Sequence, residues 1–198
     1  EDHAKIWATK RDGTEVLKGT VSVGLSAPPT ALDLRLNELP PLDQPVILSD
    51  LKVGQKTARI PVRMDANQHM GALYPFSLNE KLTAITEPSP WYLGADNPWG
   101  RAVIPVEMIS VLLNHVARQD GLKMKGPAIG LFADQEISLI KGPLFVGEDY
   151  EIEREVVALS GSRRTESYWM RTRVYHPGSS EVIATMLLNH ATLKDSYA

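Results

Sequence analysis

The stretch that decides the fold runs from Pro105 to Gln119 and reads PVEMISVLLNHVARQ. Its apolar residues recur at the three- and four-residue spacing of one helical face, at Ile109, Leu112, Leu113 and Val116. Pro105 stands where a first helical residue is favoured, and Asp120-Gly121 ends the pattern. We therefore predict one long helix from Pro105 to about Gln119.

Beyond this helix the sequence favours only strands. Alternating and β-branched patterns cover residues 128–139, 150–159, 165–175 and 182–193. The breaks between them carry the turn residues Gly142-Pro143, Ser160-Gly161-Ser162 and Pro177-Gly178. An uninterrupted run of this kind predicts an antiparallel sheet.

Before the helix, the pattern predicts a strand over residues 56–64 and a short helix that starts near Ser77. Ser77 and Glu80 have the spacing of a capping box, and Pro88 and Pro90 prevent the helix from continuing. A loop then leads to the long helix. This order predicts an α+β domain in which a bent antiparallel sheet wraps around one central helix.

The first 25 residues read as a β-hairpin with Asp12-Gly13 at its turn. Residues 26–45 are rich in proline and lack a sustained period, which predicts an extended connector. Because a lone hairpin is marginally stable in water, it must pack on the rest of the chain or on something outside it.

Composition narrows the possible partners. The chain has 198 residues, a formal charge of −3 and no cysteine. The absence of a broad positive field argues against nucleic acid, and no apolar run approaches the roughly 20 residues of a membrane span. Without cysteine there is no thiolate nucleophile or Cys-ligated zinc, and His69 and His190 have no neighbours at ligand spacing. We expect no metal, no cofactor and a reducing, cytoplasmic location.

Residues 46–193 resemble the MaoC-like hydratases and dehydratases, which have the hot-dog fold. Three segments carry the resemblance: the loop Glu87-Pro88-Ser89-Pro90-Trp91-Tyr92, the helix entry Trp99-Gly100-Arg101-Ala102-Val103-Ile104-Pro105, and the turn Lys141-Gly142-Pro143-Leu144-Phe145-Val146-Gly147-Glu148-Asp149. The resemblance implies a hot-dog domain over residues 46–198. Residues 1–25 look like the closing hairpin of a first, otherwise absent hot-dog domain joined by the connector 26–45. Alternatively, the hairpin only extends the visible sheet.

The resemblance also implies a site. In the family an Asp and a His of the loop activate water at an enoyl or 3-hydroxyacyl thioester, and helix amides receive the charge on the thioester oxygen. Here Glu87 and Tyr92 occupy the Asp and His positions, and the amides near Val106 and Glu107 are the donors. Because an unshifted tyrosine exchanges protons poorly at neutral pH, this departure puts the usual chemistry in doubt.

Further residues are candidates for substrate binding. Trp91 and Trp99 can form an aromatic wall, or simply seal the loop by packing. Asn97 lies in a turn sequence beside them. Arg163 and Arg164 could contact a phosphate of coenzyme A, although an arginine pair at a strand start is more often solvated. Glu87 likewise has the plain reading of a solvated loop carboxylate.

The leading functional hypothesis is a hydro-lyase acting on an acyl thioester of coenzyme A or acyl carrier protein, as in fatty acid or polyketide metabolism. The alternatives are a non-catalytic hot-dog half that completes a partner's acyl tunnel, and an acyl-thioester hydrolase. We expect an oligomer with another hot-dog domain or chain, because a bent sheet around one helix leaves a long edge strand open.

Overall fold

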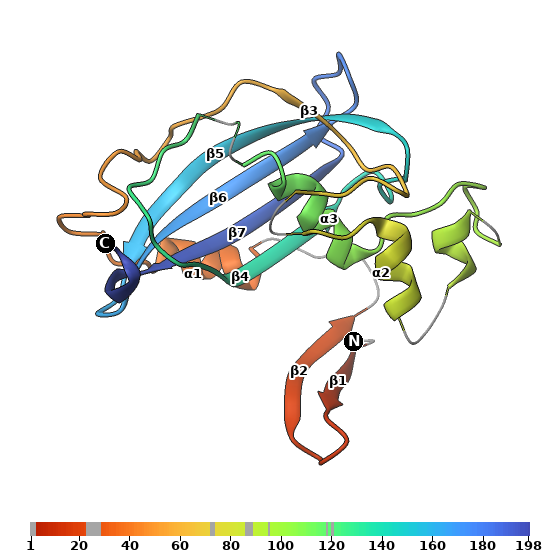
Figure 1. Cartoon of the computed structure of the whole chain (residues 1–198), viewed down its shortest axis with the longest axis horizontal. Helices are drawn as coiled ribbons and strands as arrows, with labels where there is room; N and C mark the ends of the chain where they lie inside the picture. Colours follow the sequence, from red (N-terminus) through yellow and green to blue (C-terminus); the bar gives the residue numbers. More distant parts are fainter. Residues whose placement is uncertain are drawn as a thin grey trace. The chain divides into compact units, whose positions relative to one another are not determined.

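The structure is a computed structural model that describes residues 3–22, 29–71, 74–85, 89–94, 96–117, 119 and 121–198. The chain divides into two compact units, Glu1–Asn37 and Glu38–Ala198. Each unit is described by itself (Figure 1).

The first unit holds the predicted hairpin. Strand β1 (His3–Thr9) pairs antiparallel with β2 (Glu15–Ser22), and Gly13 occupies the turn with a positive φ of 85°. A short helix, α1 (Ala31–Asn37), follows where we predicted an extended connector. The prediction was wrong there because Thr30 and Asp33 cap the helix reciprocally, each backbone N–H donating to the other's side chain.

The second unit is built on a five-stranded antiparallel sheet in the order β3-β5-β6-β7-β4 (Figure 1). Its strands are β3 (Ile60–Arg63), β4 (Gly130–Leu139), β5 (Asp149–Gly161), β6 (Thr165–Tyr175) and β7 (Ala184–Leu193). The four strands predicted after the central helix are confirmed, with β6 at the predicted bounds. The predicted strand 56–64 is shorter than expected, although Lys56 makes an isolated bridge to Glu155 beyond it.

Helix α3 (Val106–Asn114) is the centre of the core. Every residue from Met108 to Asn114 is buried, and the helix belongs to one cluster with apolar side chains of β3, β5, β6 and β7. The helix ends about five residues earlier than predicted. Beyond it, Ala117 and Gln119 donate their backbone N–H groups to carbonyls three residues back, so the chain continues as turns. Pro105 is the N-cap rather than the first helical residue.

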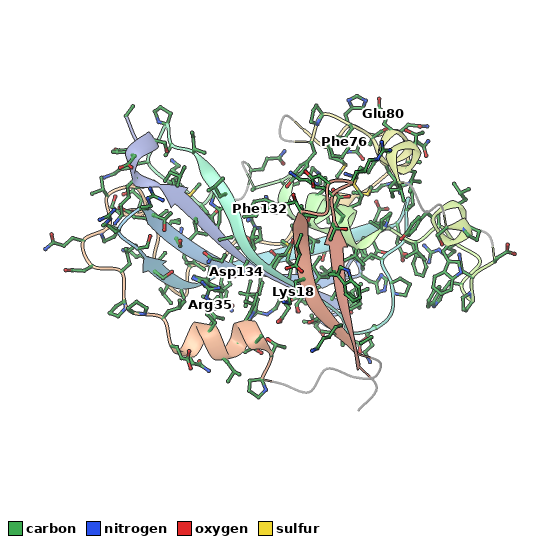
Figure 2. The ribbon with its side chains drawn as sticks, turned by 90° about the horizontal axis from the view of Figure 1, so that it is seen from below. Lys18, Arg35, Phe76, Glu80, Phe132 and Asp134 are labelled. Carbon is green, nitrogen blue, oxygen red and sulfur yellow. The ribbon has the colours of Figure 1, made fainter. Side chains whose placement is uncertain are left out.

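Helix α2 (Leu78–Ala84) precedes α3 and confirms the predicted capping box. The Ser77 hydroxyl accepts from the Glu80 backbone N–H, and the Glu80 carboxylate accepts from that of Ser77. Phe76 and Glu80 lie at the start of this helix (Figure 2). No helix among the described residues has the length and apolar character that a bilayer span requires.

One buried carboxylate ties the segment before β3 to the sheet. Glu166 on β6 is 3% exposed and accepts the backbone N–H groups of Val46, Ile47 and Leu48 at 2.9 to 3.0 Å. Ile47 and Leu48 are thereby held in a second apolar cluster with Met170 and other side chains of the sheet. Three charge-assisted hydrogen bonds make Glu166 the anchor of this segment.

Histidine 190 on β7 shares the inner face of the sheet with apolar side chains. Its ring stacks on Tyr168 with centroids 4.8 Å apart, and a Cβ at Gly130 would collide with it. Burial, with a contribution from the charge of Arg154, lowers the pKa of His190 from 6.5 to about 4. His190 is therefore neutral in the folded protein at pH 7.

We predict that Glu166→Gln lowers the free energy of unfolding by about 1–3 kcal/mol, since glutamine offers one acceptor oxygen and turns an amide group toward backbone donors. Urea denaturation measures the change. Glu181→Gln is the matched control, because its ion pair with Lys141 is exposed. A loss below about 0.5 kcal/mol for Glu166→Gln, within the range of surface changes, would contradict the anchoring role.

We also predict an acid-dependent loss of stability from His190. Because its folded pKa lies below its unfolded value, the unfolded chain binds the proton more tightly, and stability falls as the pH is lowered from about 6.5 to about 4. The expected share of His190 is about 1–3 kcal/mol, after a discount for its partial exposure. Unfolding at several pH values should show a shallower slope for His190→Phe than for the wild type. Equal slopes would show that His190 is not responsible.

Candidate functional site

A short loop lies beside the start of α3. Its 3-10 turn η1 (Pro90–Leu93) is capped by the Ser89 hydroxyl, which accepts from the Trp91 backbone N–H at 3.4 Å. The Trp91 carbonyl in turn accepts from the Val103 N–H at 3.0 Å, two residues before Pro105. This bond fixes the loop against the chain that enters the helix. Glu87 lies outside the described residues.

Two aromatic rings of this loop and one ring of the segment before β5 follow one another. Trp91 and Trp99 meet edge to face with centroids 5.6 Å apart, and Trp99 meets Phe145 at 6.2 Å. Both tryptophans stay more than 40% exposed. Asn97 shapes the turn between them, since its side chain accepts from the Trp99 N–H and donates to the Arg101 carbonyl. The structure thus brings Trp91, Trp99 and Asn97 together as a surface wall next to the helix entry.

The amino end of α3 is open at its cap. Pro105 makes no side-chain cap, so Val106 and Glu107 begin the helix where backbone N–H groups point out of the first turn. The Glu107 carboxylate is held by Lys81 of α2, with Nζ to Oε1 at 2.8 Å. A carboxylate in this turn reduces the positive potential of the helix end, and the lysine offsets part of that reduction.

Tyr92 lines a groove beside α2. The groove is apolar, has a volume of about 340 Å³ and is also lined by Leu82 and Ile85 of the α2 segment and by Leu93. Tyr92 therefore faces a hollow that is lined by residues of η1 and of the α2 segment.

Arg163 and Arg164 lie away from these residues. They form the turn between β5 and β6, whereas the helix entry touches the chain just before β5, where the Val146 N–H donates to the Ala102 carbonyl at 2.9 Å. Strand β5 has 13 residues and spans about 40 Å. The arginine pair therefore stands at the opposite end of the sheet.

A charged cluster braces the helix entry and was missed from the sequence. Glu148 accepts from Arg101 at 2.6 Å and from the Tyr150 hydroxyl at 3.1 Å, and His176 Nδ1 lies 3.5 Å from its other oxygen. The Arg101 guanidinium also covers the Phe145 ring at 4.2 Å. Burial raises the pKa of Tyr150 well above its ordinary value. The cluster joins the chain before α3 to the starts of β5 and the turn after β6.

Polar side chains of the sheet's inner face were also missed. Arg154 follows Tyr150 and Ile152 in the inward phase of β5 and is 1% exposed, and His190 follows Leu188 in the inward phase of β7. Because side chains alternate between the two faces of a strand, the sequence spacing from the apolar residues could have placed both on the inner face. Both line a cavity of about 360 Å³ at the carboxyl end of α3. Among the described residues, no three His, Asp or Glu side chains are grouped as a metal site.

No family model and no curated protein matches the sequence. Solved structures do match the fold. A MaoC-like dehydratase from Rhodospirillum rubrum superposes with a TM-score of 0.52 at 15% identity, over 75% of this chain and 97% of that one. A monoamine oxidase regulatory protein from Archaeoglobus gives 0.55 at 16% identity, over 76% and 95%.

The C-terminally truncated (3R)-hydroxyacyl-ACP dehydratase complex of Mycobacterium tuberculosis gives a TM-score of 0.53 at 12% identity, over 70% of this chain and 96% of that one. These similarities establish the fold. The second unit of the chain is therefore an α+β hot-dog domain, as the sequence predicted.

Proposed function

We propose that this chain is a hydratase or dehydratase of acyl thioesters, acting as a hot-dog unit at the amino end of α3. The observation that carries the proposal is the bond between the Trp91 carbonyl and the Val103 N–H, which holds the loop beside an uncapped helix end. Water chemistry next to a thioester requires this pairing of a proton-moving loop with backbone donors for the oxygen.

In the proposed mechanism, the N–H groups of Val106 and Glu107 receive the thioester oxygen as negative charge develops on it. Glu87 acts as the base at the water, and Tyr92 delivers the balancing proton. Trp91 and Trp99 form the wall over which the acyl group enters. The acyl carrier is coenzyme A or acyl carrier protein, and the absence of cysteine is compatible with a cytoplasmic setting.

A second candidate function is favoured by the position of Tyr92. Its place in the wall of the apolar groove, with Leu82 and Ile85, suits contact with an apolar group better than proton transfer. The chain would then be a non-catalytic half that completes the acyl tunnel of a catalytic partner. The dehydratase of Mycobacterium tuberculosis that shares this fold is itself a complex.

The partner in either case is another hot-dog unit docked along β4. This strand is at the edge of the described sheet, and Ile129, Leu131 and Phe132 at its start are each more than 40% exposed. Exposed backbone and apolar side chains on an edge strand favour addition of a second sheet.

The assay for the first function is hydration of short and medium enoyl-CoA by the purified full assembly. The reaction is monitored as the loss of absorbance of the conjugated thioester. We expect Glu87→Gln to reduce kcat at least about 100-fold and Tyr92→Phe about tenfold or more, as for loss of an acid or base. Tyr197→Phe is the control, because Tyr197 is exposed and follows η2 (Lys194–Ser196) at the end of the sheet that holds Arg164.

Activity unaffected by Glu87→Gln and Tyr92→Phe would remove this site assignment. Release of free CoA from saturated acyl-CoA without enoyl turnover would identify a hydrolase instead. If the chain is inactive alone but raises the turnover of a hot-dog partner, the non-catalytic role is correct.

The proposed docking surface along β4 can be tested separately. We expect Leu131→Lys to weaken association about tenfold or more in sedimentation velocity, because it places a charge in an apolar interface. Val53→Lys is the control, since Val53 is also an exposed apolar residue, 60% against 48% for Leu131, but lies before β3. Unchanged association by Leu131→Lys in a protein that remains folded would exclude β4 as the interface.

A further inference from the structure

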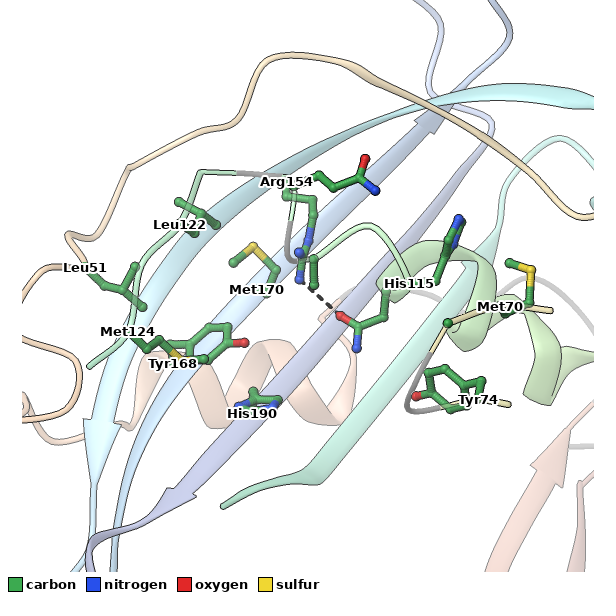
Figure 3. Close-up of a pocket in the computed structure, with 14 residues that line it drawn as sticks. Leu51, Met70, Tyr74, His115, Leu122, Met124, Arg154, Tyr168, Met170 and His190 are labelled. Atoms are coloured by element: carbon green, nitrogen blue, oxygen red, sulfur yellow. Dashed lines mark hydrogen bonds between the residues drawn. The ribbon is translucent and has the colours of Figure 1, made fainter. Parts of the chain in front are cut away.

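The cavity at the carboxyl end of α3 is a second hollow, separate from the helix entry. It holds about 360 Å³ between the inner face of β5, β6 and β7 and the turns that follow α3 (Figure 3). This volume is in the range of small-molecule sites. Met124 in its wall is 42% exposed, which gives the cavity a route to solvent.

The walls are mostly apolar and adaptable. Leu51 and Leu122 close one side, and Met70, Met124 and Met170 contribute flexible thioethers. Methionine fits ligands of irregular shape because its side chain has three rotatable bonds and a polarisable sulfur. The walls therefore favour an apolar ligand without dictating a single shape.

Polar groups enter this apolar space from three directions. The Arg154 guanidinium donates to Asn114 Oδ1 at 3.2 Å, which places a charge and a fixed amide at the end of α3. The Tyr168 and Tyr74 rings enter from the sheet and from the segment before α2, and their hydroxyls are directed to the interior of the cavity (Figure 3). These side chains place polar groups in walls that are otherwise mostly apolar.

These groups are chiefly hydrogen-bond donors. A guanidinium has no acceptor, the Asn114 oxygen is engaged by Arg154, and the Asn114 amide is hydrogen-bonded with Tyr74, whose hydroxyl keeps its own hydrogen to donate. His190 beside Tyr168 is neutral, so it adds no second charge. The complementary ligand group is an oxygen with lone pairs, near a positive charge.

We propose that this cavity binds an apolar small molecule through a carbonyl or carboxylate oxygen held by Tyr168, Tyr74 and the Arg154–Asn114 pair. Helix α3 has nine residues and a length of about 13 Å, so this oxygen is distinct from a thioester oxygen at Val106. The binding site does not depend on the proposed hydratase activity, and binding alone tests it.

The experiment uses three probes of similar shape in isothermal titration calorimetry with the full chain. Naphthalene has no oxygen, 2-acetylnaphthalene has a neutral carbonyl, and 2-naphthoate has a carboxylate. We expect at least one oxygen-bearing probe to bind about tenfold or more tightly than naphthalene, and the stronger of the two identifies the charge of the natural group.

Two sets of variants locate the binding. Ala117→Phe fills the cavity and should abolish binding of every probe, and Met124→Trp at the mouth serves if Ala117→Phe does not fold. Thr83→Phe fills the groove on α2 instead and should leave binding unchanged. Tyr168→Phe and Tyr74→Phe should each weaken the oxygen-bearing probe about three- to tenfold and naphthalene by less than twofold.

Equal affinity for all three probes would overturn the proposal, because it would mean that the polar groups of the cavity do not bind an oxygen of the ligand. Binding that survives in both cavity-filling variants, or that is lost in Thr83→Phe, would place the ligand elsewhere and would overturn it as well.

Discussion

The burial of α3 against the inner face of the antiparallel sheet is the constraint on which the rest of the structure depends. Met108, Ile109 and Leu112 are each no more than 1% exposed, in one cluster with side chains of four strands. A helix surrounded in this way must be apolar on nearly all sides, and it fixes where its two ends emerge. One end meets the loop of Trp91 and the other opens into the cavity.

This constraint explains how much could be predicted. The helix and the strands after it follow from periods of 3.6 and two that are written locally in the sequence. The capping box of Ser77 and Glu80 is equally local. The similar pair Thr30 and Asp33 was overlooked because prolines on both sides favoured an extended connector. The early end of α3 depends on the turns after Asn114, for which the apolar pattern gave no signal.

The candidate site was predictable in its parts and not in its arrangement. Trp91, Trp99 and Asn97 are neighbours in sequence and remain neighbours in space, whereas Arg163 and Arg164 lie at the far end of β5. Glu166 could not be recognised as an anchor, because its three backbone donors lie about 120 residues away. To predict the role of Arg154, one must know both that its side chain points to the inner face of β5 and that α3 ends beside it.

The domain therefore has one structural core and two chemically different ends. At the amino end, backbone donors and a loop suit water chemistry at a thioester, and at the carboxyl end, side-chain donors suit a bound oxygen. Native-state hydrogen exchange tests the shared core most directly. We expect the amides of Ile109 to Leu113 to exchange only by global unfolding, among the slowest in the protein. Exchange of these amides as fast as those of the shorter and more exposed helix α2 would contradict this expectation.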